Sequence, residues 1–154
     1  MDTLLDIART SFNALPQHSR IIGLDLGSTT IGIATADNTR QFATPRFTIA
    51  RTKFQTDVKT LLDFCTAENI GLIVMGLPLN MDGTEGRRAQ STKAFVRNLQ
   101  KLTTLPIIYW DERLSSFEAE QHMIEAGIAF SKRESQIDMR AAAIILQGVL
   151  DEVR

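Results

Sequence analysis

The sequence has little of several features that would each indicate a function. Its only cysteine is Cys65, so an internal disulfide is excluded and a reducing compartment fits. The formal net charge is −1, so any contact with nucleic acid must come from a local basic patch. No apolar run approaches the ~20 residues of a membrane span, and the start of the chain lacks the apolar stretch of a secretory signal. We therefore expect a cytoplasmic protein without a membrane partner.

The length of 154 residues and the balance of hydrophobic and charged residues fit a single globular domain. Residues 1–19 carry Leu4, Leu5 and Ala8 at helical spacing, which predicts an amphipathic helical extension. This helix is expected either to pack on the domain or to bind a partner. The domain itself is expected to span residues 20–154.

The order of the expected elements predicts an α/β fold. Two short β-rich runs flank a turn at Gly27, and a third run lies near residues 47–49. A helix expected over residues 53–69 leads into the apolar run 71–76, which is typical of a buried parallel strand. We predict a five-stranded mixed sheet, a three-stranded antiparallel meander plus two parallel strands, with helices on both faces. The remaining expected elements are a helix from residue 84 to about 102, a strand over 105–110, and helices over 115–126 and 135–153.

Acidic residues recur where the expected strands end. Asp25 lies between two leucines in the first strand, Asp82 follows the fourth strand, and Asp111 and Glu112 follow the fifth. Asp138 lies in the first turns of the last helix. Such carboxylates can share a small volume only if cations neutralise them, and oxygen ligands without histidine or cysteine suit Mg²⁺ or Mn²⁺. The pattern indicates metal-assisted phosphodiester chemistry, although Asp25 could instead cap a turn and Asp138 could interact with a helix dipole.

Basic residues that could bind a phosphate backbone lie close to these acids. Arg87 and Arg88 follow a glycine-bearing loop, and Arg113 directly follows the acidic pair, where it could bind a phosphate with two hydrogen bonds. We interpret these arginines as candidate nucleic-acid contacts.

Several motifs, in this order along the chain, resemble the YqgF (RuvX) family, and the resemblance covers about residues 20–151. It implies an RNase H-like fold and a small cytosolic nuclease. The family has been described both in 5′-end maturation of pre-16S ribosomal RNA and as a Holliday junction resolvase. The motifs are Asp25-Leu26-Gly27 with Ile31-Gly32-Ile33-Ala34, then Gly76-Leu77-Pro78-Leu79-Asn80-Met81-Asp82-Gly83, Asp111-Glu112-Arg113-Leu114-Ser115, and Asp138 with Ala141-Ala142.

The resemblance also implies roles for particular residues. By similarity to RNase H-like nucleases, Asp25, Glu112 and Asp138 would be the catalytic metal ligands, with Asp111 or Asp82 as helpers. The chain departs from the family pattern at residues 28–30, Ser-Thr-Thr, where family members commonly carry basic residues after the glycine. This departure weakens the case for phosphate contacts at the first turn but leaves the expected metal site unaffected.

The favoured hypothesis is a Mg²⁺- or Mn²⁺-dependent endonuclease acting on structured RNA, the ribosomal precursor or particles that contain it. A resolvase acting on branched DNA would use the same chemistry, and a two-fold junction would favour a homodimer over a monomer. A non-catalytic ribosome-assembly module fits the near-neutral charge, and metal titration would distinguish it. A sugar-kinase or actin-like ATP-binding protein is disfavoured, because such proteins bind ATP between two domains of this kind and 154 residues supply only one.

Overall fold

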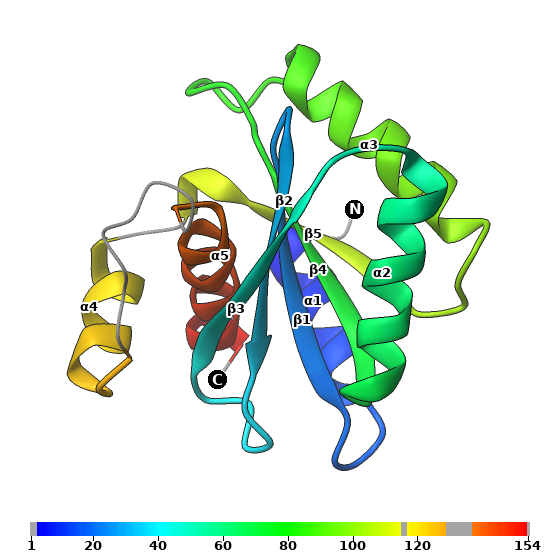
Figure 1. Cartoon of the computed structure of the whole chain (residues 1–154). Helices are drawn as coiled ribbons and strands as arrows, with labels where there is room; N and C mark the ends of the chain where they lie inside the picture. The colour runs from blue at the N-terminus through cyan, green and yellow to red at the C-terminus, as the bar shows by residue number, and fades with distance from the viewer. Residues whose placement is uncertain (1–2, 115–116, 129–136, 154) are drawn as a thin grey trace.

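The computed structural model describes residues 3–114, 117–128 and 137–153. The chain begins with a helix, continues through a hairpin and a third strand, and then alternates helices and strands (Figure 1). The elements in order are α1 (Leu4–Asn13), β1 (Arg20–Leu26), β2 (Thr30–Ala36), β3 (Ala43–Ala50), α2 (Phe54–Ala67), β4 (Ile70–Leu77), α3 (Arg87–Gln100), β5 (Ile107–Asp111), the short 3-10 helix η1 (Glu112–Leu114), α4 (Phe117–Glu125) and α5 (Ile137–Val153).

The strands form the predicted mixed sheet of five strands, in the order β3-β2-β1-β4-β5. Strands β1, β2 and β3 pair antiparallel, whereas β4 and β5 continue the sheet parallel to β1. The predicted fold class is therefore confirmed. Strand β3 begins at Ala43, before the run near residues 47–49 that was predicted as the third strand. It includes Pro45, which is tolerated because β3 is an edge strand.

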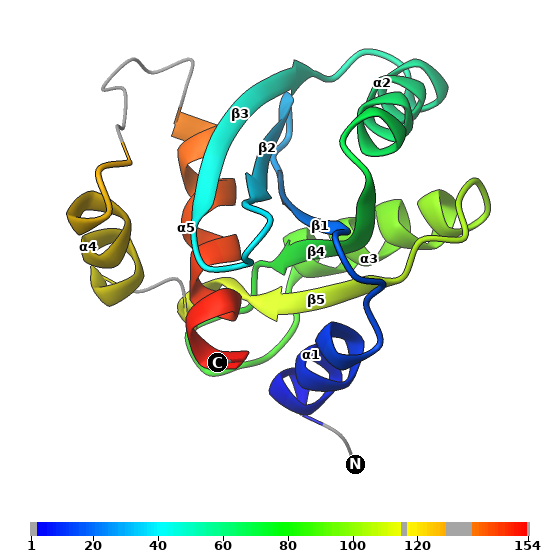
Figure 2. The same cartoon turned by 90° about the horizontal axis from the view of Figure 1, so that it is seen from below.

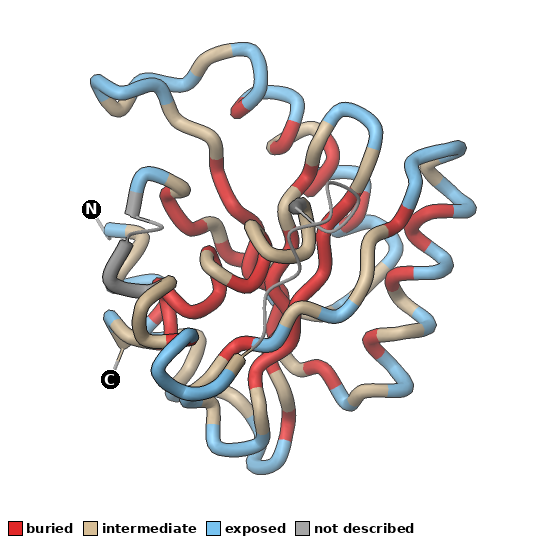
Figure 3. Tube along the Cα trace, turned by 60° about the vertical axis from the view of Figure 1, so that its left-hand side comes forward, coloured by how far each residue is buried: buried red, intermediate tan, exposed pale blue. Residues whose placement is uncertain are grey.

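Helices cover both faces of the sheet, with α5 on one face and α2 and α3 on the other (Figure 1). The alternation of side chains along β1 explains this arrangement. Ile21 belongs to the core cluster that contains the apolar residues of α5. Ile22 and Leu24 belong to the opposite cluster, with residues of α2 and α3. In Figure 3 the buried stretches accordingly run through the central strands.

The amino-terminal helix α1 lies beside β5, as the view from below shows (Figure 2). Thr3 and Asp6 begin the helix with a reciprocal capping box, in which each side chain accepts a hydrogen bond from the other residue's backbone N–H. Ala8 is fully buried in the cluster formed with α5, and Leu5 and Phe12 pack against that cluster. The apolar face expected for residues 1–19 thus packs on the rest of the protein.

The buried side chain of Gln147 holds α5 against the edge of the sheet. Its Oε1 accepts a hydrogen bond from the Ala43 backbone N–H at 2.9 Å. Its Nε2 donates to the Gln41 carbonyl oxygen and to Asp151 Oδ1, each at 2.9 Å. These hydrogen bonds satisfy a polar group that is fully buried, and they fix the position of α5 relative to β3. No helix among the described residues is both long enough and apolar enough to span a bilayer.

Candidate active site

Asp25 lies near the end of β1 on the face covered by α5, with a glycine on the strand beside it. In the antiparallel register Asp25 pairs with Gly32 of β2. On the other side, the parallel register that pairs Leu24 with Met75 brings Asp25 next to Gly76 of β4. A Cβ atom at Gly76 would lie 2.9 Å from Glu112 Oε1 and 2.7 Å from Ile145 Cδ1. Because glycine has no side chain, Gly32 and Gly76 leave room on this face for α5 and for a second carboxylate.

Glu112 supplies that second carboxylate from the residue that follows β5. Its carboxyl group shares a hydrogen bond with the Asp25 carboxylate. Burial, the nearby charge of Asp25 and this hydrogen bond raise the pKa of Glu112 to about 7. Burial also raises the pKa of Asp25; the hydrogen bond with Glu112 opposes this shift and the charge of Asp138 reinforces it. The two acids therefore form a half-buried pair that holds a proton near neutral pH.

Asp138 reaches the same edge of the sheet from the first turn of α5. A Cβ atom at Gly32 would lie 2.0 Å from the Asp138 carbonyl oxygen, so only glycine permits this approach of helix to strand. The Thr30 hydroxyl donates a hydrogen bond to Asp138 Oδ2. The start of α5 is thus fixed against β2, one strand away from Asp25.

Two adjoining cavities open at this edge of the sheet. The first, of about 350 Å³, is lined by Asp25, Glu112, Arg88 and apolar residues of α5. The second, of about 490 Å³, is lined by the turn of residues 26–30, by Asp138 and by residues of α3. Arg88 lines both cavities, and its charge lowers the pKa values of Asp25 and Glu112 against the effect of burial. The site therefore combines a carboxylate cavity with a neighbouring basic one.

The candidate helper Asp111 and the arginine Arg113 form a pair of their own. Arg113 Nε and Nη2 donate to the Asp111 carboxylate at 3.0 and 2.7 Å, and Nη1 donates to the Met81 carbonyl oxygen at 3.0 Å. Burial would raise the pKa of Asp111, but the hydrogen bonds from Arg113 outweigh it and hold that pKa below its usual range. This pair connects the end of β5 to the loop that precedes α3.

Asp82, the other candidate helper, lies on that loop and is exposed. Its Oδ1 accepts hydrogen bonds from the Thr84 backbone N–H at 3.0 Å and from the Thr84 hydroxyl at 2.6 Å. Because Thr84 takes part in this turn, α3 begins at Arg87 instead of at residue 84 as the sequence suggested. Asp82 lines neither of the two cavities.

Arg51 lines the second cavity, although the sequence indicated it only as one of several available basic residues and did not single it out as a site residue. It follows β3, far along the chain from the turn of residues 26–30, yet its Nη1 donates to the Gly27 carbonyl oxygen at 2.7 Å. The sequence signal that could have found it is its position directly after the third strand, which is antiparallel to β2 and ends beside that turn.

The described residues contain no group of three carboxylate, histidine or cysteine side chains already close enough to hold a metal ion. The donor set nevertheless suits a hard divalent cation, because Asp25, Glu112 and Asp138 offer only oxygen ligands. The raised pKa values of Asp25 and Glu112 show that negative charge is crowded here, so positive charge would be stabilised at this place.

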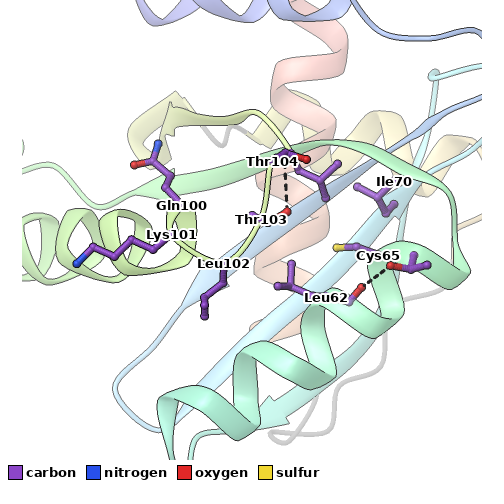
Figure 4. Close-up of a pocket in the computed structure, with 10 residues that line it drawn as sticks. Leu62, Cys65, Ile70, Gln100, Lys101, Leu102, Thr103 and Thr104 are labelled. Atoms are coloured by element: carbon purple, nitrogen blue, oxygen red, sulfur yellow. Dashed lines mark hydrogen bonds between the residues drawn. The ribbon is translucent and has the colours of Figure 1, made fainter.

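A larger cavity, of about 670 Å³, lies at the opposite end of the sheet, where β4 and β5 begin (Figure 4). Leu62 and Cys65 of α2 line it together with Leu102 after α3. Burial raises the pKa of the Cys65 thiol to about 12, so this cysteine is unreactive at neutral pH. No acidic residue or histidine lines this cavity, and we do not assign it a role in the chemistry.

Comparison with known proteins gives close relatives along most of the chain. A family model described as "RuvX: Holliday junction resolvase" matches residues 19–152. A protein of Chelativorans sp. (strain BNC1), named "Putative pre-16S rRNA nuclease", is 55% identical over 134 residues, which are 87% of this chain and 84% of that protein. A protein of the same name from Rhizobium leguminosarum bv. trifolii (strain WSM2304) is 48% identical over 151 residues, 98% of this chain and 92% of that protein.

Solved structures share the fold at low sequence identity. Thermus thermophilus RuvC in complex with a Holliday junction substrate superposes with a TM-score of 0.60 at 12% identity, covering 87% of this chain and 94% of that chain. The yeast mitochondrial Holliday junction resolvase Ydc2 gives a TM-score of 0.53 at 14% identity, covering 96% of this chain and 85% of that chain. These likenesses confirm the predicted RNase H-like fold. From the family match and the close relatives, the chain belongs to the RuvX family, and the enzyme class predicted from the sequence, a phosphodiester hydrolase, is confirmed with it.

Proposed function

We propose that this protein is a divalent-metal-dependent endonuclease that acts in the 5′-end maturation of pre-16S ribosomal RNA. The observation that carries the proposal is the half-buried pair of Asp25 and Glu112, which opens into a cavity that also exposes Arg88. A carboxylate pair in which the pKa of Glu112 is raised to about 7, beside an arginine that forms no ion pair with any described residue, suits a site that takes up a cation and a phosphate together.

Asp25, Glu112 and Asp138 would hold Mg²⁺ or Mn²⁺ as oxygen ligands. When bound, such ions activate water and stabilise the leaving oxygen in phosphodiester hydrolysis. The chain's own residues prepare the site. Gly32 admits the start of α5, and the Thr30 hydroxyl orients the Asp138 carboxylate. Burial of Asp25 and Glu112 limits water around their oxygens, which strengthens their attraction to positive charge.

Arginine side chains would bind the substrate backbone. Arg88 lies between the carboxylates and the second cavity, and Arg87 lines the second cavity. Arg113 already uses its guanidinium to bind Asp111 and Met81. We therefore propose that Asp111 and Arg113 position the loop before α3, and that Asp82 shapes this loop through Thr84.

The proposed partners are structured RNA and the ribosomal precursor particles that contain it, in the cytoplasm, with the protein acting as a monomer or homodimer. The description of the family model favours a second candidate function, cleavage of branched DNA as a Holliday junction resolvase. Both functions would use the same carboxylates, because hydrolysis of either backbone is the same reaction.

A direct comparison of substrates tests the proposal. The purified protein would be incubated with Mg²⁺ or Mn²⁺ and either an RNA spanning the 5′ end of 16S rRNA with its leader or a four-way DNA junction. We expect cleavage of the RNA at a defined position and none of the junction. Cleavage of the junction alone, by a species with the solution mass of a dimer, would favour the resolvase instead. Cleavage of neither, with no metal binding, would favour a non-catalytic assembly module.

A further inference from the structure

We propose that the second cavity is a binding site for a backbone phosphate of the polynucleotide next to the one that is cleaved, with Arg51 as its principal cation. This inference rests on the proposed nuclease function, since it assigns a part of the substrate to a part of the same site. The cavity of about 490 Å³ is lined by three arginines, Arg51, Arg87 and Arg88, and by small hydroxyl side chains that include Ser28 and Ser91.

The position of Arg51 is fixed by two hydrogen bonds to the turn between β1 and β2. Its backbone N–H donates to the Thr29 carbonyl oxygen at 2.8 Å, and its Nη1 donates to the Gly27 carbonyl oxygen at 2.7 Å. Its guanidinium carbon also lies 5.8 Å from the centre of the Phe95 ring. Because a guanidinium has five N–H donors, one hydrogen bond to Gly27 leaves most of them for a ligand.

This geometry explains how the turn can bind phosphate although Ser28, Thr29 and Thr30 carry no charge. Arg51 places a positive charge beside the turn from a different strand. The hydroxyl groups of Ser28 and Thr29 are exposed in the same cavity and can donate to phosphate oxygens. Arg51 thus supplies, from another strand, the positive charge that the turn itself lacks.

Two of the cavity arginines, Arg51 and Arg87, have no acidic partner within the part of the chain that the structure describes, whereas the charge of Arg88 acts on Asp25 and Glu112 in the neighbouring cavity. Other basic residues have acidic partners there: Lys93 pairs with Glu85, and Arg113 with Asp111. Arg51, Arg87 and Arg88 form no ion pair with any described residue. Three arginines and one acidic residue, Asp138, line this cavity, so its local charge favours a polyanionic ligand although the overall charge of the protein does not.

The second cavity adjoins the cavity that contains the carboxylates. Asp138 lines it, and Arg88 lines both this cavity and the one that contains Asp25 and Glu112. A strand whose scissile phosphate lies at the carboxylates can therefore continue past Arg88 into the basic cavity. Its next phosphate would then contact Arg51.

A bracing role for Arg51 is the alternative, since its hydrogen bond to Gly27 could simply stabilise the turn. Binding measured as a function of salt separates the two roles, because log K falls with log salt and each phosphate contact that is lost reduces the steepness of this fall by about 0.7 for a single strand. The experiment uses the full chain in EDTA, with fluorescently labelled single-stranded RNA and single-stranded DNA of the same sequence. The variants are Arg51→Gln, Arg51→Lys and a matched control, Arg97→Gln, which removes an exposed arginine of α3 outside the cavity.

We expect R51Q to weaken binding of both strands about threefold to tenfold and to reduce the magnitude of the salt slope by about 0.7, with R51K intermediate and R97Q unchanged. In cleavage assays the loss should lie mainly in KM. Equal slopes for R51Q and the wild type would overturn the phosphate site, even if R51Q melts at a lower temperature. An R51Q defect no larger than that of R97Q would also overturn it. If the wild type binds as expected but cleaves nothing with Mg²⁺ or Mn²⁺, the proposed nuclease function fails while the phosphate site stands.

Discussion

Gly32 and Asp138 approach each other so closely that a Cβ atom on residue 32 would lie 2.0 Å from the Asp138 carbonyl oxygen. Neither the carbonyl oxygen nor the strand beneath it can rotate away, so the contact can be relieved only by moving the start of α5. Because Asp138 lies in the first turn of that helix, one glycine on β2 determines where a candidate metal ligand lies.

The first prediction follows from this contact. Gly32→Ala should displace the first turn of α5, lower Tm by about 5 °C through overpacking, and reduce cleavage far more than that loss of stability explains. Gly86→Ala is the matched control, because its Cβ would lie 3.1 Å from Asn80 Oδ1, a side-chain atom that can move, and Gly86 lines neither cavity. Thermal denaturation and cleavage rates of both variants check the prediction, and equal behaviour of the two would contradict it.

The second prediction concerns pH. Burial and the charge of Asp25 raise the pKa of Glu112 from 4.5 to about 7, so the folded protein binds this proton more tightly than the unfolded chain. The associated stability is fully present below about pH 4.5 and is lost as the pH rises to about 7. Without metal, the wild-type Tm should therefore decline across this interval more steeply than that of Glu112→Gln. The exposed Glu125→Gln variant should follow the wild type.

The third prediction concerns metal. Mn²⁺ at about 100 times its Kd should stabilise the folded protein by about 2.7 kcal/mol, which corresponds to about 5–10 °C in Tm. The gain should be larger at pH 8 than at pH 6, because at pH 6 the cation competes with the proton of Glu112. It should disappear in Glu112→Gln and persist in Asp82→Asn, whose carboxylate lies on the loop and binds Thr84. A persistent gain in E112Q would remove Glu112 from the ligand set.

The fourth prediction concerns the pair of Arg113 and Asp111. Arg113→Gln leaves the buried Asp111 carboxylate without its main partner and frees the loop at Met81, so Tm should fall by about 5 °C. The double variant Asp111→Asn with Arg113→Gln should recover part of this loss, because the unpaired charge is gone. If R113Q instead leaves stability unchanged and only weakens RNA binding, Arg113 contacts the substrate directly.

The strands and helices could be predicted from the sequence because hydrophobic spacing reports local structure. The apolar run at residues 71–76 and the alternation around Asp25 predicted a buried parallel strand and a hairpin, which the structure contains. The sequence also placed Asp25 and Glu112 at strand ends, and parallel strands that end at one edge bring such residues together.

Tertiary contacts could not be predicted in the same way. Arg51 reaches Gly27 only because β3 pairs with β2 in one particular register, which local spacing does not reveal. Arg113 binds Asp111 because η1 turns its side chain back toward the strand, whereas the sequence suggested a phosphate contact. The closeness of Gly32 to Asp138 depends on where α5 crosses the sheet, and this is a property of packing.

The central claim, that the carboxylates around Asp25 form a metal-dependent catalytic centre, is tested most directly by cleavage with Asp25→Asn. The measurement is the rate of Mg²⁺-dependent cleavage of RNA carrying the 16S leader, for the wild type and D25N, with circular dichroism to show that both are folded. We predict that the wild type cleaves and that a folded D25N loses at least about 100-fold in rate. Equal rates for the two proteins would contradict the account.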